Sequence, residues 1–424
     1  MISIRKFFKT LGPGVITGAA DDDPSGIATY TQAGAQFGYG QLWTAFFILP
    51  LQSAIQEACA RIGAVKGKGI AAVVKEHYGK KVLYPAVTLV LLANVINIGA
   101  DLGAMAAAAR LIFPINFAVL AIGFTVLILA LEIFTSYRLY ANILKWFSLS
   151  LLAYPLTILI IQAPWATILK ATFIPHLEFT FPFLFIMTAV LGTTISPYMF
   201  FWQASEEVEE ERKNNLIGWD KKPRIGRFFI QNLRLDNFLG MCFSGLGTWS
   251  IIVVAATTLH ANGITNIASS ADAAKALEPL VATFPHAGFL AKLLFSFGII
   301  GLGLLAIPVL AGSASYALSE AFSWREGLYL KLRQAGGFYG LIIAATLVGL
   351  LINLVGIDPV GALVFSAVIN GLVAVPLILV IALMAGNEKI MGKYKSGWLS
   401  NFFVWLTFIG MAIAALAMFI SLCK

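Results

Sequence analysis

The sequence predicts an all-α polytopic membrane protein with a 5+5 inverted repeat of helices and an eleventh helix at the end. Of its 424 residues, 59% are hydrophobic and 12% are charged, and the mean hydropathy is +0.85, a composition outside the range of soluble globular domains. Two apolar stretches, one in each half, are interrupted by a short polar residue and a proline. Two broken helices in corresponding positions are typical of secondary transporters with inverted repeats.

Eleven mostly apolar runs are long enough to cross the hydrocarbon core as helices, which takes about 20 residues. They lie at 12–38, 42–64, 83–109, 116–135, 143–162, 182–207, 235–259, 288–320, 338–356, 360–386 and 402–423. The two repeats are then expected at 12–162 and 182–386, with an extracellular connector at 163–181 and helix eleven within 387–424. Helices one and six are the broken ones.

The distribution of basic residues predicts the orientation, because cytoplasmic loops carry an excess of Lys and Arg. With the N-terminus inside, all but five of the 29 basic residues lie on the inner side, the exceptions being Arg110, Lys170, Lys275, Lys292 and Lys424. We therefore expect residues 1–11 and a charged loop at 206–234 to be cytoplasmic, and the C-terminus to be extracytoplasmic. Such a chain fits a bacterial-type inner membrane, and Gly12-Pro13-Gly14 interrupts any signal-peptide core, so no cleavage is expected.

The first break carries three consecutive carboxylates, Asp21, Asp22 and Asp23, followed by Pro24. A helix N-cap followed by proline would explain Asp23 alone. It does not explain the other two acids, and acidic groups at membrane depth indicate a functional site. Because successive helical residues diverge by about 100°, the three cannot all face one ion. Asp23 is the primary candidate ligand for a cation, with Asp22 beside it.

Two further polar features lie at membrane depth. The second break, Ser196-Pro197, repeats the capping pattern of the first. On helix three, Asn94, Asn97 and Asp101 form one polar stripe, in which a buried carboxylate needs a cation, a proton or a partner. For the two asparagines, a role at the ion site and hydrogen bonding between helices are equally good explanations.

Other polar residues favour structural roles. Glu57 and Arg61 are spaced i, i+4 on helix two and are expected to pair. Asn370-Gly371 on helix ten is more typical of helix packing than of a ligand. The sequence has no nucleotide-binding loop, zinc-ligand pattern or nucleophile elbow, so we predict no enzymatic activity and no cofactor.

Together these stretches resemble the Nramp family of divalent-metal transporters. The resemblance covers nearly the whole chain: Gly12-Pro13-Gly14, the Asp23-Pro24 break, QEACARIG at 56–63 and the Ser-Pro-Tyr break in helix six occur in the family's order. It implies a LeuT-like fold. It also implies a metal bound between helices one and six, where the family reads Asp-Pro-Gly-Asn and Ala-x-x-Met-Pro-His.

Carried over onto this chain, the family ligands are Asp23 for Asp, Gly26 for Asn, Ser196 for Met and the Thr193 carbonyl for that of Ala. The acidic residue on helix three becomes Asp101. Two side-chain ligands are therefore missing. This pattern is closer to the Nramp-related magnesium transporter branch, whose wider site holds an ion that keeps much of its water.

The expected function is import of Mg²⁺, Mn²⁺ or both by alternating access. The alternatives are a conventional Mn²⁺/Fe²⁺ proton symporter of the Nramp type and an organic-solute symporter, such as an amino-acid symporter, on the same fold. The expected partners are divalent metal ions and the lipid bilayer, without nucleic acid or an obligate protein partner.

Overall fold

The computed structural model describes residues 13–135, 147–217 and 223–422, which form helices and one isolated β-bridge between Ile217 and Pro223. Within the described ranges, eight spans are long and apolar enough to cross a membrane by length and composition. This count takes residues 181–213 as one span and does not include the helix at 43–66. The predicted all-helical membrane fold is therefore confirmed.

The spans agree with the sequence to within a few residues for most helices. Their bounds are α4 (Trp43–Lys66), α6 (Lys80–Arg110), α7 (Phe117–Phe134), α13 (Arg227–Thr258), α15 (Ala287–Phe322), α16 (Gly336–Asn353), α17 (Pro359–Gly386) and α19 (Trp398–Leu422). Helix α13 begins well before the predicted 235, and its first two turns carry Arg227 and Arg234 out of the apolar run.

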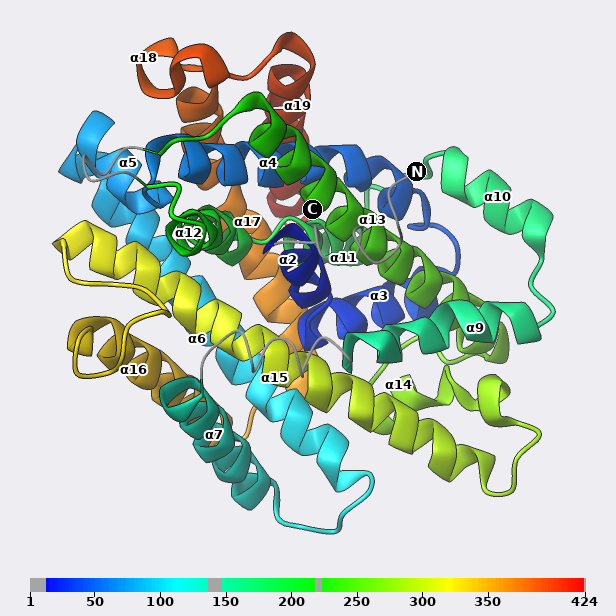
Figure 1. Cartoon of the computed structure of the whole chain (residues 1–424). Coiled ribbons are helices and arrows are strands. Elements are labelled where there is room, and N and C mark those ends of the chain that lie inside the picture. The colour runs from blue at the N-terminus through cyan, green and yellow to red at the C-terminus, as the bar shows by residue number, and fades with distance from the viewer. Residues whose placement is uncertain (1–12, 136–146, 218–222, 423–424) are drawn as a thin grey trace.

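Both predicted breaks are present. The first span divides into α2 (Pro13–Asp21) and α3 (Pro24–Phe37), and the sixth divides into α11 (Phe181–Thr194) and α12 (Pro197–Lys213). In each, proline occupies the first turn of the second half-helix, where its missing N–H leaves no helical hydrogen bond unmade. In Figure 1 the pair α2 and α3 lies near the centre of the molecule, between α13 and α15.

The two halves pack reciprocally, as an inverted repeat requires. Broken helices α2 and α3 of the first half lie against α13 of the second, while α12 of the second half lies against α4 of the first. A Cβ on Gly18 would come within 2.3 Å of the Gly240 carbonyl oxygen, and one on Gly63 within 2.2 Å of the Ala204 carbonyl oxygen. Such close backbone approach through small residues is how membrane helices pack.

Residues between the spans form shorter elements. The predicted fifth span lies partly outside the described residues, and its described part comprises a 3₁₀ turn η1 (Phe147–Leu152) and α9 (Ala153–Ile160). The segment expected to be a connector at 163–181 contains α10 (Trp165–Phe173), and the connection between α13 and α15 contains α14 (Ser270–Lys275). Elsewhere, α5 (Ile70–His77) follows α4, and α18 (Glu388–Met391) precedes α19.

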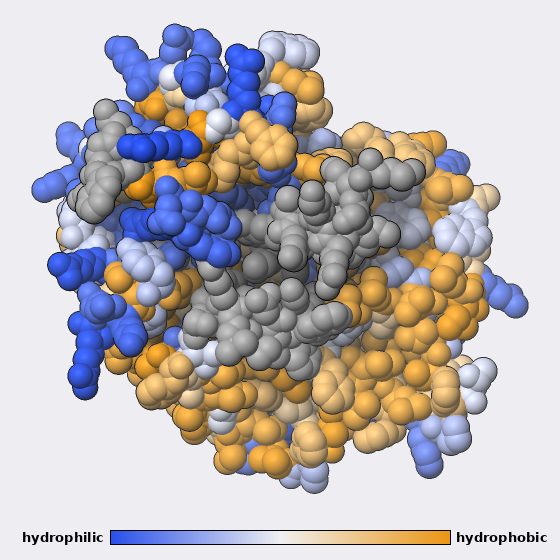
Figure 2. Space-filling view, in the orientation of Figure 1, coloured by the Kyte–Doolittle hydropathy of each residue, from blue (hydrophilic) through white to orange (hydrophobic). Residues whose placement is uncertain are grey.

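The surface divides by polarity. Figure 2 shows hydrophilic residues gathered at the end of the molecule where α5 and α18 lie, whereas hydrophobic residues cover most of the opposite lower part. Helix α18, which carries Lys389, lies at this polar end. Many large apolar side chains are exposed beside this charged end, as expected of a protein that spans a bilayer.

Candidate functional site

The two helix breaks lie side by side. Ser25 Oγ, in the first turn of α3, lies 3.1 Å from Thr193 Oγ1 near the end of α11. One turn further along α3, Tyr30 forms a hydrogen bond of 2.8 Å between its hydroxyl group and Thr194 Oγ1. On the other side, Tyr198 of α12 donates to the Ala20 carbonyl oxygen at 3.2 Å. The two helix breaks, one from each half of the chain, therefore form one polar centre inside the helix bundle.

Asp23 occupies the N-cap of α3 and is 1% exposed. Its Oδ1 accepts hydrogen bonds from Ser25 Oγ at 2.6 Å and from the Gly26 amide at 2.9 Å, so the capping role is real. Oδ2 points to α6, where it accepts from Asn97 Nδ2 at 2.9 Å. No ion pair joins Asp23 to a basic side chain in the described part of the chain. A buried carboxylate held only by neutral donors retains a strong attraction for a cation.

Helix α6 and helix α17 complete this centre with amides. Asn97 Nδ2 also donates to Asp101 Oδ2 at 3.1 Å, and Asn97 Oδ1 accepts from Asn370 Nδ2 at 3.2 Å. Asp101 is fully buried, and its Oδ1 has no hydrogen-bond partner, nor does Asn370 Oδ1. Asn97 thus connects the two carboxylates, and two orphaned oxygens remain nearby. The sequence favours a packing role for Asn370, and in the structure its amide also reaches Asn97 of α6.

The second break contributes oxygen atoms of a different kind. Ser196 Oγ donates to the carbonyl oxygens of Gly192 at 2.9 Å and Thr193 at 2.7 Å. The Thr193 carbonyl, expected as a ligand, therefore already accepts one hydrogen bond and keeps its second lone pair. At Gly26, a Cβ would meet the Tyr30 ring at 3.3 Å and Thr193 Oγ1 at 3.4 Å. The room around Gly26 is bounded by these two side chains.

The carboxylates of Asp21 and Asp22 lie in a second cluster. Ser244 of α13 donates to Asp21 Oδ2 at 2.7 Å and to Asp22 Oδ1 at 3.3 Å, and Gln52 of α4 also donates to Asp21. A Cβ on Gly247 would lie 2.8 Å from Asp22 Oδ2. Asp22, one of the candidate ligands, therefore faces α13, whereas Asp23 and Asp101 share the hydrogen-bond network on α6.

Of the four buried aspartates near the breaks, only Asp23 and Asp101 share one hydrogen-bond network. No group of three or more His, Cys, Asp or Glu side chains within the described ranges is placed to hold a metal ion. Any ion here has to rely on one or two carboxylates together with amide, hydroxyl and carbonyl oxygens. Hard cations that retain bound water accept such a donor set.

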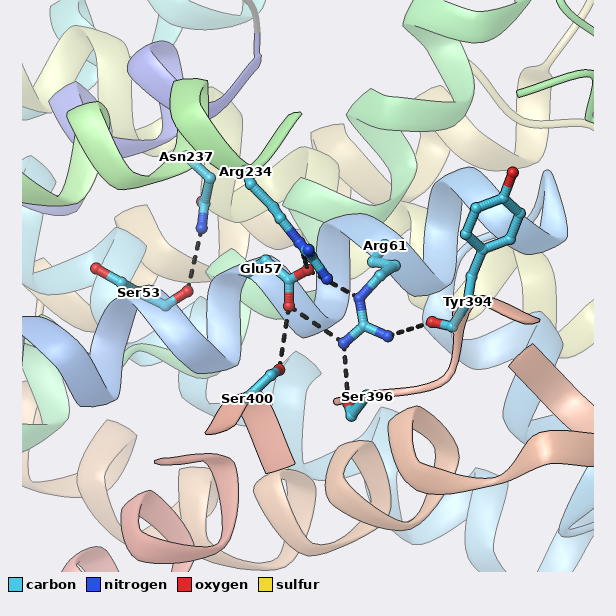
Figure 3. Close-up of polar contacts among 8 residues, drawn as sticks. All are labelled: Ser53, Glu57, Arg61, Arg234, Asn237, Tyr394, Ser396 and Ser400. Atoms are coloured by element: carbon cyan, nitrogen blue, oxygen red, sulfur yellow. Dashed lines mark hydrogen bonds and ion pairs between the residues drawn. The ribbon is translucent and has the colours of Figure 1, made fainter. Parts of the chain in front are cut away.

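A third polar cluster, drawn in Figure 3, lies away from the breaks. The expected pair is confirmed, with Arg61 Nε 2.8 Å from Glu57 Oε1. The sequence did not reveal that Arg234 of α13 shares the same carboxylate, with its Nε 2.9 Å from Glu57 Oε1. A separation of 177 residues along the chain hides this contact from any local pattern.

Solved structures with similar folds are transporters. A manganese transporter of Eremococcus coleocola superposes with a TM-score of 0.73 at 16% identity, covering 98% of this chain and 86% of that one. MhsT, solved in complex with L-phenylalanine, superposes with a TM-score of 0.62 at 14% identity, covering 96% and 98% of the two chains. At such identities the likeness concerns the fold alone, and it confirms the predicted LeuT-like class.

Comparison of sequences identifies the family, which the likeness of folds does not. A divalent metal cation transporter MntH of Klebsiella pneumoniae subsp. pneumoniae is 27% identical over 412 residues, covering 96% of this chain and 91% of that protein. The model of the family described as natural resistance-associated macrophage protein-like matches residues 14–421. That match spans both repeats, both breaks and the eleventh helix, and this chain therefore belongs to the Nramp family.

Proposed function

We propose that this protein transports divalent metal cations across a membrane, with the cation bound where the breaks of the first and sixth spans meet. The observation that carries the proposal is the buried Asp23 carboxylate, which caps α3 between the two breaks and has no basic partner among the described residues. The Nramp membership and the MntH relative agree with this substrate class. Alternating access would follow from rocking of one set of helices against the other around this fixed centre.

Asp23 is proposed as the direct ligand, with oxygens of Thr193 and Ser196 from the second break. Asp101 would act from α6 through Asn97, whose amide contacts both carboxylates. Gly26 contributes no side chain, and Asp22 contributes negative charge from the neighbouring cluster instead of a bond.

This donor set favours hard ions. A thioether would favour Mn²⁺, Fe²⁺ or Cd²⁺, but the corresponding position holds Ser196. Mg²⁺ is usually held by one or two carboxylates and several retained waters. We therefore propose Mg²⁺ as a substrate alongside Mn²⁺, as in the magnesium branch that the sequence resembles.

An organic-solute symporter on the same fold is the weaker proposal. A zwitterionic substrate needs a counter-charge for its carboxylate, yet the charged side chains nearest the breaks are Asp21, Asp22, Asp23 and Asp101, all fully or almost fully buried. Four acidic groups would repel a carboxylate in a medium of low dielectric constant.

Competition between the two ions tests the proposal. The purified chain is reconstituted into vesicles loaded with a metal-sensitive dye, and Mn²⁺ uptake is measured with and without external Mg²⁺. We expect millimolar Mg²⁺ to inhibit Mn²⁺ uptake. If Mg²⁺ at that concentration has no effect, a conventional transition-metal importer of the same family becomes the better account. If no divalent ion enters the vesicles, metal transport itself is refuted.

A further inference from the structure

The Glu57 cluster contains more positive than negative charge. Arg61 is fully buried, and its guanidinium makes four hydrogen bonds: Nε and Nη2 bind Glu57, Nη1 donates to the Tyr394 carbonyl, and Nη2 donates to Ser396 Oγ at 2.9 Å. One carboxylate and one arginine already form a neutral pair. Arg234 is a second guanidinium on the same carboxylate, so the cluster has a surplus of one positive charge.

Arg234 is the outer member of this cluster. Its side chain is 51% exposed, against 1% for Arg61. Only its Nε binds Glu57, and its two Nη groups have no hydrogen bond to any described residue. Figure 3 shows Arg234 reaching Glu57 from the α13 side, opposite the segment that carries Tyr394, Ser396 and Ser400. The surplus charge is therefore presented outward, with donors free to bind an anion.

Arg234 also lines a groove. A cavity of about 480 Å³ lies between α4, α13 and the start of α19, and its apolar wall includes Phe238, Trp398, Leu399 and Phe403. A second groove of about 310 Å³ runs along α19 past Phe402, Trp405 and Ile409. Trp398 lines both of them. Trp398 therefore lies between two grooves, and Arg234 lines one of them.

The position of the groove fits a membrane surface. Trp398 is the first residue of α19 and is 81% exposed, and tryptophan gathers at the boundary between lipid and water. Arg234 lies seven residues after the start of α13, where the polar helix end meets the apolar span. Lys389, Lys393 and Lys395 precede Trp398 in the same connection. Figure 2 shows hydrophobic residues directly beside hydrophilic ones at this end of the molecule.

We propose that this groove is a binding site for an anionic phospholipid. The phosphodiester would bind the free Nη groups of Arg234, one acyl chain would lie over Phe238 and Phe403, and the other would follow α19 on the far side of Trp398. Arginine suits a phosphate because its guanidinium presents paired donors. Polar residues of the groove, Ser53, Glu57, Asn237 and Ser400, lie beside Arg234 in its lining, and Phe238, Trp398, Leu399 and Phe403 form its apolar wall. A lipid is favoured over a free phosphate because this apolar wall accompanies the arginine, and basic pockets between membrane helices bind anionic head groups.

Such a lipid would connect α13 to α19. The residues between Tyr394 and Ser400 already bind Glu57 and Arg61 through Tyr394 O, Ser396 Oγ and Ser400 Oγ. A bound phosphodiester would add a contact on the α13 side, so the lipid would stabilise the packing of the eleventh helix against the bundle. The site is independent of the metal substrate and of the proposed transport.

The test measures lipid binding to the purified full-length protein in detergent by native mass spectrometry. Dioleoyl phosphatidylglycerol is compared with dioleoyl phosphatidylcholine, which has the same chains but a choline cation that offsets the phosphate. One surface Lys or Arg changes membrane affinity by about fivefold, so we expect wild-type protein to prefer phosphatidylglycerol by roughly that factor. Arg234→Gln should abolish the preference, while leaving the Glu57–Arg61 pair intact.

Two variants and one small anion complete the experiment. Arg227→Gln removes an exposed charge from the same helix outside the groove and should keep the preference. Trp398→Ala leaves the charge cluster untouched and should weaken binding of both lipids without changing their ratio. It therefore tests the groove even if Arg234→Gln proves unstable. Equal binding of the two lipids by wild-type protein would overturn the proposal, as would an unchanged preference in Arg234→Gln. Displacement of the lipid by equimolar glycerol 3-phosphate would assign a small-anion site instead.

Discussion

Replacing Asp23 with Asn separates its capping role from its charge. The Oδ1 atom remains and can still accept from Ser25 Oγ and the Gly26 amide, whose distances are 2.6 and 2.9 Å. The cap, worth about 1 kcal/mol, is therefore kept. The new Nδ2 faces Asn97 Nδ2, so two donors oppose each other. The hydrogen bond from Asn97 to the Asp23 carboxylate is lost, and such a bond to a charged group contributes about 1.5–3 kcal/mol to stability. Loss of a buried charge offsets part of this cost, so folding should be little affected.

Substrate binding should change far more. Two unit charges about 4 Å apart interact by about 4 kcal/mol at an effective dielectric constant of 20, and each 1.4 kcal/mol is tenfold in affinity. We expect Asp23→Asn to lower Mn²⁺ uptake by at least about 100-fold at low metal concentration. Uptake into dye-loaded vesicles measures this, with thermal melting in detergent as the folding control. Wild-type uptake by a folded Asp23→Asn protein would refute the assignment of Asp23.

Three further predictions follow from the neighbouring residues. Asp101→Asn should reduce uptake by less, about tenfold, because Asp101 reaches Asp23 only through Asn97; an effect equal to that of Asp23→Asn would indicate direct ligation. Ser196→Met should shift competition in the uptake assay toward Cd²⁺ over Mg²⁺, since it introduces a soft thioether, and unchanged selectivity would show that this side chain does not face the ion. Burial, reinforced by neighbouring acidic side chains, raises the pKa of Glu326 in the α15–α16 loop to about 9 from 4.5, so the folded protein binds a proton that the unfolded chain releases. Stability should then fall as pH rises between these values, by up to about 1.4 kcal/mol per pH unit, and Glu326→Gln should flatten the dependence of melting temperature on pH.

Sequence reasoning predicted the parts of this structure that depend on local pattern. The apolar spans other than the fifth, and the breaks at Asp23-Pro24 and Ser196-Pro197, follow from hydropathy and from proline chemistry, and they are confirmed. The pairing of Glu57 with Arg61 follows from helical spacing and is confirmed as well. These predictions needed only residues within one or two turns of each other.

Contacts between distant residues were beyond such reasoning. Asn370 binds Asn97 across 273 residues, and Ser25 meets Thr193 across 168. Those contacts depend on how four helices pack. A small residue such as Gly371 indicates a packing surface, but its partners Thr188 and Gly192 have no signal in the local sequence. Asp23 lies in one hydrogen-bond cluster and Asp21 and Asp22 in another, and the sequence predicted this separation only in part. Helical geometry excluded a common ion for all three, but the partner of Asp22 on α13 required the tertiary structure.

Direct titration tests the central claim, that the polar centre between the two breaks binds a divalent cation. Purified wild-type protein is titrated with Mg²⁺, Mn²⁺, Ca²⁺ and Cd²⁺ in a calorimeter, and the Asp23→Asn variant is titrated in parallel. The account predicts saturable binding of Mg²⁺ and Mn²⁺ to the wild-type protein and its loss in the variant. Absence of binding for all four ions, or equal binding by the variant, would contradict it.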